Sequence, residues 1–404
     1  MMKKTKMKRV PKLRFPEFTD DWEQRKAVDI ADYSKGNGYS KGDLTDFGIP
    51  IILYGRLYTK YQFAISEVDT FALPRNGAVY SQGNEVIVPA SGETAEDIAR
   101  ASAVEKSGVL LGGDLNILRP FDFMNPLFLA LAISSGEPQK ELAKKAQGKS
   151  VVHIHNTDIQ EVTIAYPSRT EQERIVSVFR QLDHLITLHQ RKLKNLNVLK
   201  KCVMQKLFSQ KVRFKADDGS EFPKWKEKRL GDVFTERTER SKGGETLLSV
   251  TIAQGIVRQS ETDKRNTASE NKSNYKIVKR NDLAYNTMRM WQGAEGVSEY
   301  DGIVSPAYTV ITALDGNNSY FFEILFKQTF MLQIFQRYSQ GLTSDTWNLK
   351  FPAFSEIKCL VPCEDEQNKI VECVKVLDSV IEKQKATLAA WEELKKGLLQ
   401  QMFV

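Results

Sequence analysis

The stretch EQERIVSVFRQLD at residues 171–183 returns as EQNKIVECVKVLD at residues 366–378, and this repeat decides the fold. The copies lie 195 positions apart and align without a gap as far as Phe208 and Phe403. Self-similarity at one fixed offset over such a length indicates a duplicated structural unit rather than chance. We therefore expect two copies of one architecture in this chain of 404 residues.

A second, weaker repeat precedes each copy of the first. LRFPEFTDDWEQRKAVDI, which starts at Leu13, resembles VRFKADDGSEFPKWKEKRLGDVF, which starts at Val212. The corresponding residues are Phe18, Trp22 and Asp29 in the first half and Phe222, Trp225 and Asp232 in the second. The blocks between the repeats, roughly residues 40–150 and 240–345, have diverged. A shared frame around two divergent blocks predicts two modules that bind different targets.

Each copy of the first repeat predicts a long helix with one apolar face. Apolar residues recur at spacings of three, four and seven, as in a coiled coil. About 38 residues at 1.5 Å per residue give helices of roughly 57 Å. Two similar helices in one chain most simply pair antiparallel with pseudo-twofold symmetry. The seam positions are Ile175, Leu182, His189 and Leu196 in the first helix and Ile370, Leu377, Gln384 and Trp391 in the second.

One position of this seam is polar in both helices, and it is occupied by His189 and its counterpart Gln384. We interpret both residues as groups that fix the helix register, which is a known role of a lone polar residue in a coiled-coil seam. A metal-binding or proton-transfer role for His189 is the alternative.

The diverged blocks have the strand and helix patterns of a mixed α/β (α+β) fold. Strands are expected at Gly48–Thr59, Asn84–Ser91, Lys279–Met288 and Ser305–Thr312, and buried helices at Asn125–Gly136 and Ser319–Gly341. The predicted organisation is a first globular domain at residues 1–165 with a basic tail at 1–12, a spacer helix at 166–209, a second domain at 210–360 and a second spacer helix at 361–404.

Composition places the chain among globular proteins without a membrane span. Hydrophobic residues make up 41% and charged residues 27% of the sequence, and no run of about 18 apolar residues occurs. The first residues lack the apolar core of a secretory signal. We therefore expect a cytoplasmic protein whose cysteines are reduced. The net charge of +7 is compatible with a nucleic-acid partner.

The sequence contains no convincing catalytic, cofactor-binding or metal-binding motif. The Gly148–Ser150 stretch, GKS, resembles the end of a phosphate-binding loop, but Ala143 stands where that motif needs a glycine. The four cysteines lack the spacing of a zinc site. All four histidines fall between residues 153 and 189, so we do not expect acid–base sites that use histidine elsewhere in the fold.

Several residues instead suit contacts with DNA. Arginine and glutamine can bond to guanine and adenine edges, whereas backbone amides and hydroxyl groups bind phosphates. Clusters of arginine with aromatic residues occur in both blocks, and a polar loop with a glycine follows each buried helix. Candidate DNA contacts are Arg56, Tyr58, Lys60, Lys149 and Ser150 in the first block and Arg258, Arg289, Trp291, Gln292, Thr343 and Ser344 in the second. A solvated surface or a packing role is the alternative for each.

Together these segments resemble the specificity subunit of type I restriction–modification systems, over essentially the whole chain. The resemblance rests on RFPEF followed by Trp22, on GSEFPKWKEKRLGDVF at residues 219–234, on the two EQ-x-(R/K)-I-V…LD segments and on the K-K-x-x-x-Q-x-(L/M)-F endings. The first half departs from this pattern at residues 27–30, where AVDI stands in place of LGDVF. This departure leaves the early boundary of the first domain less defined.

The resemblance implies two target-recognition domains, each of which reads one half of a bipartite site in double-stranded DNA. The two helices would form an antiparallel coiled coil that sets the spacing of the domains. The implied partners are two methyltransferase subunits, which bind S-adenosylmethionine, and restriction subunits, which translocate DNA with ATP and Mg²⁺. This chain would itself hold no cofactor and no catalytic residue. Whole heptads inserted into either helix would then lengthen the unread spacer.

Two other functions stay open from the sequence. A stand-alone DNA methyltransferase or nuclease with an unrecognised active site would act on DNA without a partner. A coiled-coil scaffold without a DNA role would show no sequence preference at moderate salt even together with its methyltransferase partner.

Overall fold

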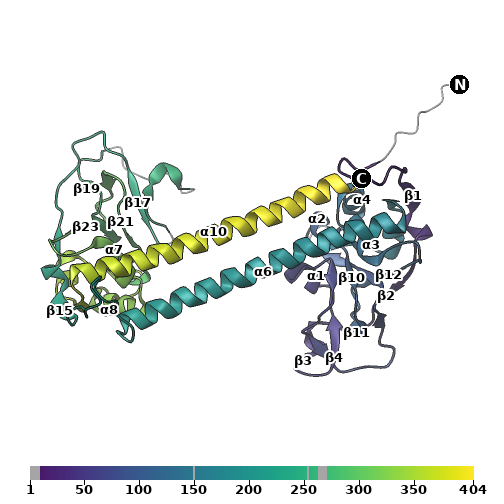
Figure 1. Ribbon diagram of the computed structural model, residues 1–404, viewed down its shortest axis with the longest axis horizontal. Helices are drawn as coiled ribbons and strands as arrows, with labels where there is room; N and C mark the ends of the chain where they lie inside the picture. Colours follow the sequence, from purple (N-terminus) through teal and green to yellow (C-terminus); the bar gives the residue numbers. More distant parts are fainter. Residues whose placement is uncertain (1–9, 149–150, 253, 263–270) are drawn as a thin grey trace. The chain divides into compact units, whose positions relative to one another are not determined.

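The computed structural model describes residues 10–148, 151–252, 254–262 and 271–404, and these residues divide into two compact units. Unit 1 contains residues 1–192 and 385–404, and unit 2 contains residues 193–384. The two longest helices, α6 (Arg169–Phe208) and α10 (Glu364–Met402), each begin in one unit and end in the other (Figure 1). Segments from both halves of the sequence therefore complete each unit.

Unit 1 is mixed α/β, as the sequence predicts. Its strands are β1 (Glu23–Lys26), β2 (Ala31–Lys35), β3 (Leu44–Thr45), β4 (Ile49–Ile52), β5 (Ala64–Ile65), β6 (Phe71–Ala72), β7 (Tyr80–Gln82), β8 (Glu85–Pro89), β9 (Ser91–Gly92), β10 (Ser102–Val104), β11 (Ser107–Leu111), β12 (Leu115–Pro120), β13 (Val152–His153) and β14 (Thr163–Tyr166). Its helices besides α6 are α1 (Arg56–Thr59), α2 (Ala95–Ile98), α3 (Pro126–Ile133), α4 (Gly136–Lys145) and α5 (Asn156–Gln160), with 3-10 turns η1 (Ala27–Asp29) and η2 (Lys41–Asp43).

Unit 2 is mixed α/β as well. Its strands are β15 (Lys226–Arg229), β16 (Phe234–Glu236), β17 (Leu248–Thr251), β18 (Gly255–Arg258), β19 (Lys276–Val278), β20 (Leu283–Asn286), β21 (Glu295–Val297), β22 (Gly302–Val304), β23 (Tyr308–Ala313) and β24 (Lys358–Val361). Its helices besides α10 are α7 (Ser319–Phe326), α8 (Thr329–Tyr338) and α9 (Phe351–Ser355), with 3-10 turns η3 (Leu230–Asp232), η4 (Gln259–Glu261) and η5 (Met290–Gln292).

The central sheet of unit 1 has the strand order β2-β12-β8-β10-β5 and is covered on both faces. Successive side chains of a strand point to opposite faces, and β8 shows the consequence. Val86 and Val88 pack in the core that contains α3, whereas Ile87 packs toward a second sheet of order β3-β6-β4-β11-β7. Unit 1 thus has three layers, namely helices, a central sheet and a second sheet.

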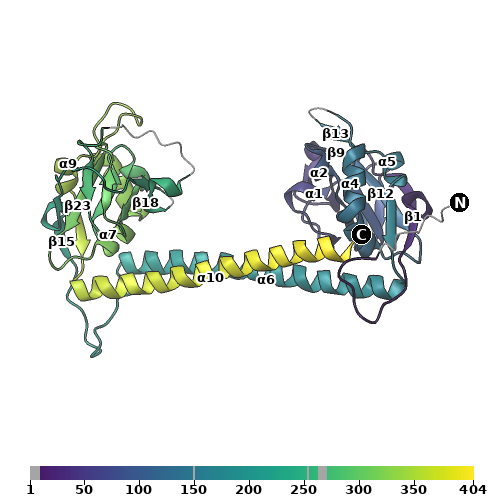
Figure 2. The ribbon, with the colours of Figure 1, turned by 90° about the horizontal axis from the view of Figure 1, so that it is seen from above.

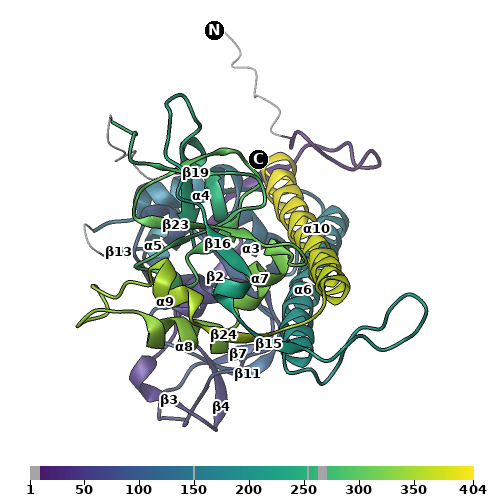
Figure 3. The ribbon, with the colours of Figure 1, turned by 90° about the vertical axis from the view of Figure 1, so that its left-hand side faces the viewer.

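Unit 2 repeats this plan with different strands, which can be followed in Figure 3. Its central sheet has the order β16-β23-β20-β21. Leu283 and Tyr285 pack in the core with α7, whereas Ala284 packs with the β17–β18 and β19–β22 pairs. The strands of the two central sheets correspond by their position in these layers. In order, β2, β12, β8 and β10 of unit 1 match β16, β23, β20 and β21 of unit 2. The two divergent blocks therefore share a fold that their sequences reveal only as a coarse pattern.

Two predicted elements differ in the structure. The strand expected at Gly48–Thr59 ends at Ile52, and its last four residues form the helical turn α1. The helix expected at Ser319–Gly341 is divided into α7 and α8, because Gln328 between them has an extended backbone with φ −72° and ψ 139°. The Gln328 side chain donates to the Ile324 carbonyl at 2.9 Å, which satisfies one of the acceptors at the end of α7.

In unit 1 the first part of α6 packs antiparallel to the last part of α10 (Figure 1). The ring centroids of Phe179 and Phe403 lie 6.0 Å apart, and those of His189 and Trp391 lie 6.3 Å apart. Between these contacts, the ammonium group of Lys395 pairs with Asp183. Residue numbers rise along α6 as they fall along α10, which confirms the predicted antiparallel pairing.

Unit 2 contains the matching ion pair, in which Lys200 of α6 bonds to Asp378 of α10. In the repeat, Lys200 corresponds to Lys395 and Asp183 corresponds to Asp378. Each copy thus offers its aspartate to the lysine of the other copy, which is the reciprocal contact pattern of a twofold interface. The repeat in the sequence becomes a self-complementary pair of helices.

The predicted seam residues do not all lie between the two helices. Ile175 and Ile370 are each 1% exposed and pack in the cores of units 1 and 2, because the first turns of each long helix lie against a globular block. Leu182 also joins the core of unit 1. The half-buried seam residues are His189, Leu196, Leu377 and Trp391, and Gln384 is buried.

Candidate nucleic-acid interface

Each unit fastens the start of a long helix with a buried Arg-Glu-Trp cluster. In unit 1, Arg14 donates from Nε and Nη2 to the two carboxylate oxygens of Glu171, each at 2.8 Å. Trp22 Nε1 donates to the same carboxylate at 3.4 Å. Glu171 is 1% exposed, and its hydrogen bonds raise the pKa of Arg14. Such a two-pronged pair fixes the orientation of both partners.

Unit 2 builds the same cluster from the second copy. Arg213 donates to Glu366 at 3.0 and 2.6 Å, and Trp225 Nε1 donates to Glu366 at 3.1 Å. Glu366 is also 1% exposed, and its hydrogen bonds raise the pKa of Arg213. The glutamate that begins each repeat therefore has a structural role.

The glutamine that follows each glutamate completes the attachment. Gln172 Oε1 accepts the Asn125 amide at 2.7 Å, and its Nε2 donates to the carbonyl of the proline five residues earlier at 2.9 Å. Gln367 makes the same two bonds, with the Asn318 amide at 2.8 Å and a proline carbonyl at 3.0 Å. Asn125 and Asn318 cap α3 and α7 with their side chains. The glutamines thereby position these helices as well.

The sequence pattern alone does not identify these clusters. The only trace of the clusters in the sequence is two matches between the halves. LRF matches VRF in the weaker repeat, and the two EQ pairs match in the stronger one. What the pattern does not reveal is that Arg14 meets Glu171, a partner 157 positions away.

A short closed loop follows α4 in unit 1 and α8 in unit 2. The loop of unit 1 joins Gln147 to His153 and that of unit 2 joins Gln340 to Asn348, and the end residues of each exchange both backbone hydrogen bonds. The second residue is a glycine in both loops, with φ of 134° and 144°, in a region that favours glycine. We call these two equivalent segments the Gln-Gly loops.

Each Gln-Gly loop is joined to the turn that follows the middle strand of the central sheet. The residue after the loop donates its amide to that turn, Ile154 to Ala90 at 3.0 Å and Leu349 to Thr287 at 2.8 Å. In unit 1, β13 of the loop also pairs with β9 of the turn (Figure 2). We define the loop–turn surface of unit 1 as residues 90–100 with 147–148 and 151–153, and that of unit 2 as residues 287–293 with 340–348.

The loop–turn surface of unit 2 brings together most of the DNA contacts predicted for the second block. Trp291 of the turn packs edge-to-face on Trp347 of the loop, with ring centroids 5.1 Å apart. Among the described residues, none accepts a hydrogen bond from the half-buried side chain of Arg289. The exposed members of this surface include Gln292, Thr343 and Ser344.

The loop–turn surface of unit 1 has a different chemistry. Tyr58 donates its hydroxyl to the Ser91 carbonyl at 2.8 Å, and the guanidinium of Arg100 lies 5.2 Å from its ring centroid. The acidic residues of the turn are Glu93, Glu96 and Asp97. Two predicted contacts, Lys149 and Ser150, belong to the Gln-Gly loop but lie outside the described residues.

Two predicted contacts of the first block are engaged within the protein. The Arg56 side chain is 8% exposed and donates to Asp69, to Gln62 and to a backbone carbonyl. Lys60 is 54% exposed and pairs with Asp69 at 2.6 Å. Because the guanidinium of Arg56 is buried and used in holding this segment, we do not retain Arg56 as a DNA contact. Lys60 stays a prediction.

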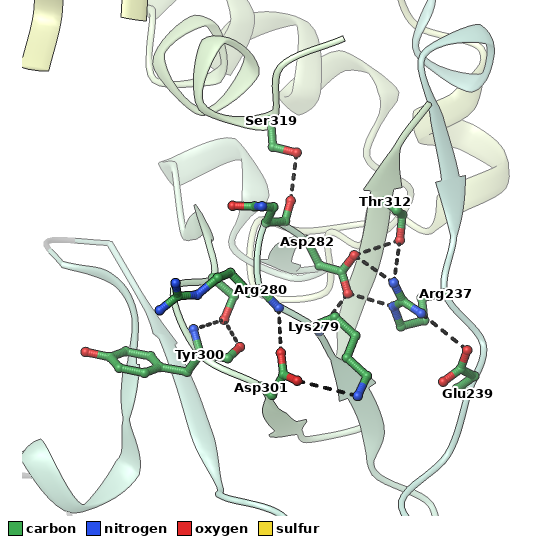
Figure 4. Close-up of polar contacts among 11 residues, drawn as sticks. Arg237, Glu239, Lys279, Arg280, Asp282, Tyr300, Asp301, Thr312 and Ser319 are labelled. Carbon is green, nitrogen blue, oxygen red and sulfur yellow. Dashed lines mark hydrogen bonds and ion pairs between the residues drawn. The ribbon is translucent and has the colours of Figure 1, made fainter. Parts of the chain in front are cut away.

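A second exposed cationic group of unit 2 surrounds the predicted contact Arg258. The guanidinium of Arg258 lies 4.6 Å from the ring centroid of Tyr300, beside an open cleft of about 470 Å³ that Arg280 also lines. Figure 4 shows how Arg280 is held, since its amide donates to Asp301 at 2.8 Å and its Nε to a backbone carbonyl at 3.0 Å. Glu261 lies 3.5 Å from Arg258, and Glu299 and Asp301 also line the cleft, so this open surface combines charges of both signs with an aromatic ring.

A buried ion pair anchors the middle strand that leads to the turn of unit 2 (Figure 4). Arg237 donates to Asp282 at 2.6 and 3.0 Å, and the Thr312 hydroxyl donates to the same carboxylate at 2.7 Å. Asp282 is 2% exposed, and its hydrogen bonds raise the pKa of Arg237. Unit 1 places the buried Glu85 beside Arg119, at 3.6 Å, at the equivalent strand. Both turns therefore start from a fixed strand.

Unit 2 also buries a carboxylate that has no hydrogen bond to any described residue. Glu295 of β21 is fully buried, and the Lys327 ammonium group lies 3.8 Å from it. Burial raises the pKa of Glu295 well above its usual value, and Lys327 opposes this shift only in part. Glu295 lies on β21, the strand that follows the turn bearing Arg289.

We expect unit 2 to lose stability as the pH rises above the ordinary glutamate pKa of 4.5. The unfolded state releases the Glu295 proton near that pH, whereas the folded state retains it to higher pH, so the free energy of unfolding falls across this window. Glu295→Gln should remove the loss, and the exposed control Glu299→Gln should not. Hydrogen exchange of the β20–β21 amides between about pH 5 and 8 measures the effect. An unchanged pH profile in Glu295→Gln would contradict it.

The described residues include no group of three or more His, Cys, Asp or Glu side chains that could hold a metal ion. Within the same part of the chain, no helix combines the length and the hydropathy that are needed to cross a membrane.

Comparison with known proteins assigns a family. The family model described as "Type I restriction modification DNA specificity domain" matches twice, over residues 19–198 and 223–390. The chain belongs to this family. The two matches to the specificity-domain family fall one on each half of the repeat and together cover most of the sequence.

The type I restriction enzyme MjaVIII specificity subunit of Methanocaldococcus jannaschii is 25% identical over 236 residues, which are 57% of this chain and 52% of that protein. This chain therefore matches about half the length of that curated relative. The S subunit of a type I restriction–modification system from M. genitalium has the same fold, with a TM-score of 0.60 at 16% identity over 98% and 99% of the two chains. The HsdS subunit from Thermoanaerobacter tengcongensis gives a TM-score of 0.50 at 15% identity over 95% and 96%.

Proposed function

We propose that this chain is the DNA sequence-specificity subunit of a type I restriction–modification enzyme. The observation that carries the proposal is the pair of loop–turn surfaces, which occupy equivalent places on one repeated scaffold yet differ in chemistry. The surface of unit 1 bears acidic residues and Arg100 and packs on Tyr58, whereas that of unit 2 bears Arg289, Trp291 and Gln292. Each unit would then read one half of a bipartite site, and the two half-sites would differ in sequence.

In unit 2, Arg289 and Gln292 have the groups that read base edges. A guanidinium can donate two hydrogen bonds to guanine, and a carboxamide pairs with adenine. The hydroxyl groups of Thr343 and Ser344 suit phosphate contacts, which position the protein without reading the sequence. Arg258, stacked on Tyr300, adds a further cation for the DNA backbone.

In unit 1 the proposed phosphate contacts are Lys60 and two residues of the Gln-Gly loop, Lys149 and Ser150. The acidic residues of the turn in unit 1 suit base recognition, because a carboxylate accepts a hydrogen bond from the amino group of cytosine. Tyr58 supports that turn through its bond to Ser91. The two surfaces therefore favour different bases by their charge alone.

The long helices are proposed to set the distance between the half-sites and to dock the methyltransferase subunits. Helices of 40 and 39 residues are about 60 Å long, compared with roughly 34–36 Å for one turn of DNA. Leu199 and Leu394, equivalent in the repeat, are 49% and 45% exposed on these helices. They are apolar positions at which a partner can bind.

The chain is proposed to be non-catalytic. S-adenosylmethionine would be bound by two methyltransferase subunits, and ATP with Mg²⁺ by the restriction subunits. Incubating the purified chain with S-adenosylmethionine and duplex DNA tests this assignment. Methyl transfer in the absence of any partner would support a stand-alone methyltransferase instead.

Arg289→Ala is expected to weaken binding to the cognate duplex by about 10- to 100-fold and to relax one base position of one half-site. The reason is that a bidentate base contact contributes about 1–3 kcal/mol of discrimination. The measurement is competition binding with single-base variants of the site, mapped beforehand from methylated bases in host DNA. Lys358→Ala, which removes an exposed cation elsewhere in unit 2, should leave the specificity unchanged. If Arg289→Ala keeps every base preference, Arg289 is not a reader.

A further inference from the structure

The Gln-Gly loop of unit 2 holds one apolar side chain fully in solvent. Leu342 is 101% exposed, more than any other large hydrophobic residue that the structure describes. A single exposed leucine needs no explanation by itself. Leu342 differs from the ordinary case because the loop that carries it is firmly supported and adjoins the candidate DNA contacts.

The base of this loop is closed and its first turn leaves room only for glycine. Gln340 and Asn348 exchange backbone hydrogen bonds of 3.0 and 2.8 Å. A Cβ atom on Gly341 would lie 2.6 Å from a backbone oxygen of the same loop, and its φ is 144°. The backbone immediately before Leu342 therefore has a conformation that favours glycine, and the side chain of Leu342 lies in solvent.

Trp347 ties the far side of the loop to the neighbouring turn. Its amide donates to the Thr343 carbonyl at 3.1 Å, and its ring packs 5.1 Å from Trp291. The turn that bears Trp291 also bears Arg289, the guanidinium without an acceptor among the described residues. Leu342 thus lies on a loop that is held at both ends, and on the same surface as Arg289.

The Gln-Gly loop of unit 1 also bears an exposed aliphatic side chain, at a different distance from its glycine. Val151 lies three residues after Gly148 and is 49% exposed. Both equivalent loops therefore present a branched aliphatic side chain to solvent.

We propose that Leu342 is an apolar wedge that enters the DNA base stack in the half-site read by unit 2, with Val151 as its counterpart in unit 1. This inference rests on the proposed DNA-binding function and specifies how that surface acts. An aliphatic group inserted at a base step unstacks it, and the distortion is easiest at flexible pyrimidine–purine steps. Unit 2 then selects its half-site by deformability as well as by base edges.

The test uses the full-length chain and a duplex whose half-sites are mapped from methylated host DNA. Methyltransferase subunits are left out, because their own base flipping would also unstack a base. 2-Aminopurine placed at successive steps reports unstacking as a rise in fluorescence. We expect the parent chain to cause a rise at one step of each half-site. Leu342→Ala should abolish the rise in one half-site at saturating protein and weaken binding about tenfold.

Two variants serve as controls. Leu314→Ala, which truncates another exposed leucine of unit 2, should match the parent in fluorescence and affinity. Val151→Ala should remove the rise in the other half-site only. An unchanged rise with Leu342→Ala, or tight sequence-specific binding by the parent without any rise, would overturn the wedge. A parent chain that shows no sequence preference would reject the proposed function, and the wedge with it.

Discussion

Replacing Glu366 by alanine is expected to destabilise unit 2 by about 3–5 kcal/mol, because the change leaves a largely buried guanidinium without its carboxylate. The Arg213 side chain is 19% exposed and that of Glu366 is 1% exposed. The same change removes the acceptor of the Trp225 indole N–H. A single melting temperature is poorly defined for a chain of two units, so the quantity to measure is the hydrogen-exchange protection of unit 2 amides.

The matched control for this prediction is Glu372→Ala, an exposed glutamate further along α10, which should change stability by no more than about 0.5 kcal/mol. The double variant Arg213→Leu/Glu366→Leu should lose less stability than Glu366→Ala, since no unpaired charge stays buried. Unit 1 amides should keep their protection throughout. A loss below about 1 kcal/mol, the range of a surface ion pair, would show that the Arg-Glu-Trp cluster does not fasten the helix.

Adding three heptads to α6 and three to α10 is expected to lengthen the preferred DNA spacer by about one helical turn. Three heptads extend a helix by roughly 32 Å, close to the 34–36 Å of a DNA turn, so both half-sites return to the same face of the duplex. Binding to the original spacing should weaken by about 10²- to 10⁴-fold, because both units can no longer bind together. The bases of each half-site should stay the same.

The insertions belong between Asp183 and Lys200 in α6 and between Asp378 and Lys395 in α10, so that both reciprocal ion pairs are kept. The measurement is binding across duplexes whose spacers differ by one base pair at a time. A single paired heptad is the control. It adds roughly 10 Å, about a third of a DNA turn, and should leave no spacer that restores the parent affinity. An unchanged preferred spacer in the three-heptad variant would exclude the ruler role.

The long helices could be predicted because periodicity and an internal repeat are visible in one sequence. Their antiparallel pairing followed from similarity between the copies, and the ion pairs of Asp183 with Lys395 and of Lys200 with Asp378 agree with it. The Arg-Glu-Trp clusters could not be predicted in the same way. Charged residues such as Arg14 are usually exposed, and only the folded chain shows which of them is buried against a distant carboxylate.

The candidate site shows the same division between local and tertiary information. The loop with Thr343 could be found because a glycine and hydroxyl residues follow an apolar helix, which is a local pattern. Arg56 and Arg289 look alike in sequence, since both lie among aromatic residues. The structure separates them, because Asp69 returns to the side of Arg56 whereas no described carboxylate reaches Arg289. Whether an arginine is free for a ligand depends on such tertiary neighbours.

Phe403 packs against Phe128 and Phe179 in the core of unit 1, at centroid distances of 5.4 and 6.0 Å. The ribosome adds about 5–20 residues per second, so roughly ten to forty seconds pass between the synthesis of Phe208 and that of Phe403. Throughout this interval the nascent first half exposes the aromatic surface that Phe403 will cover. Unit 2 closes around its own helix ends sooner, because α10 begins within it. The half of the protein that is translated first is therefore the half whose core is completed last.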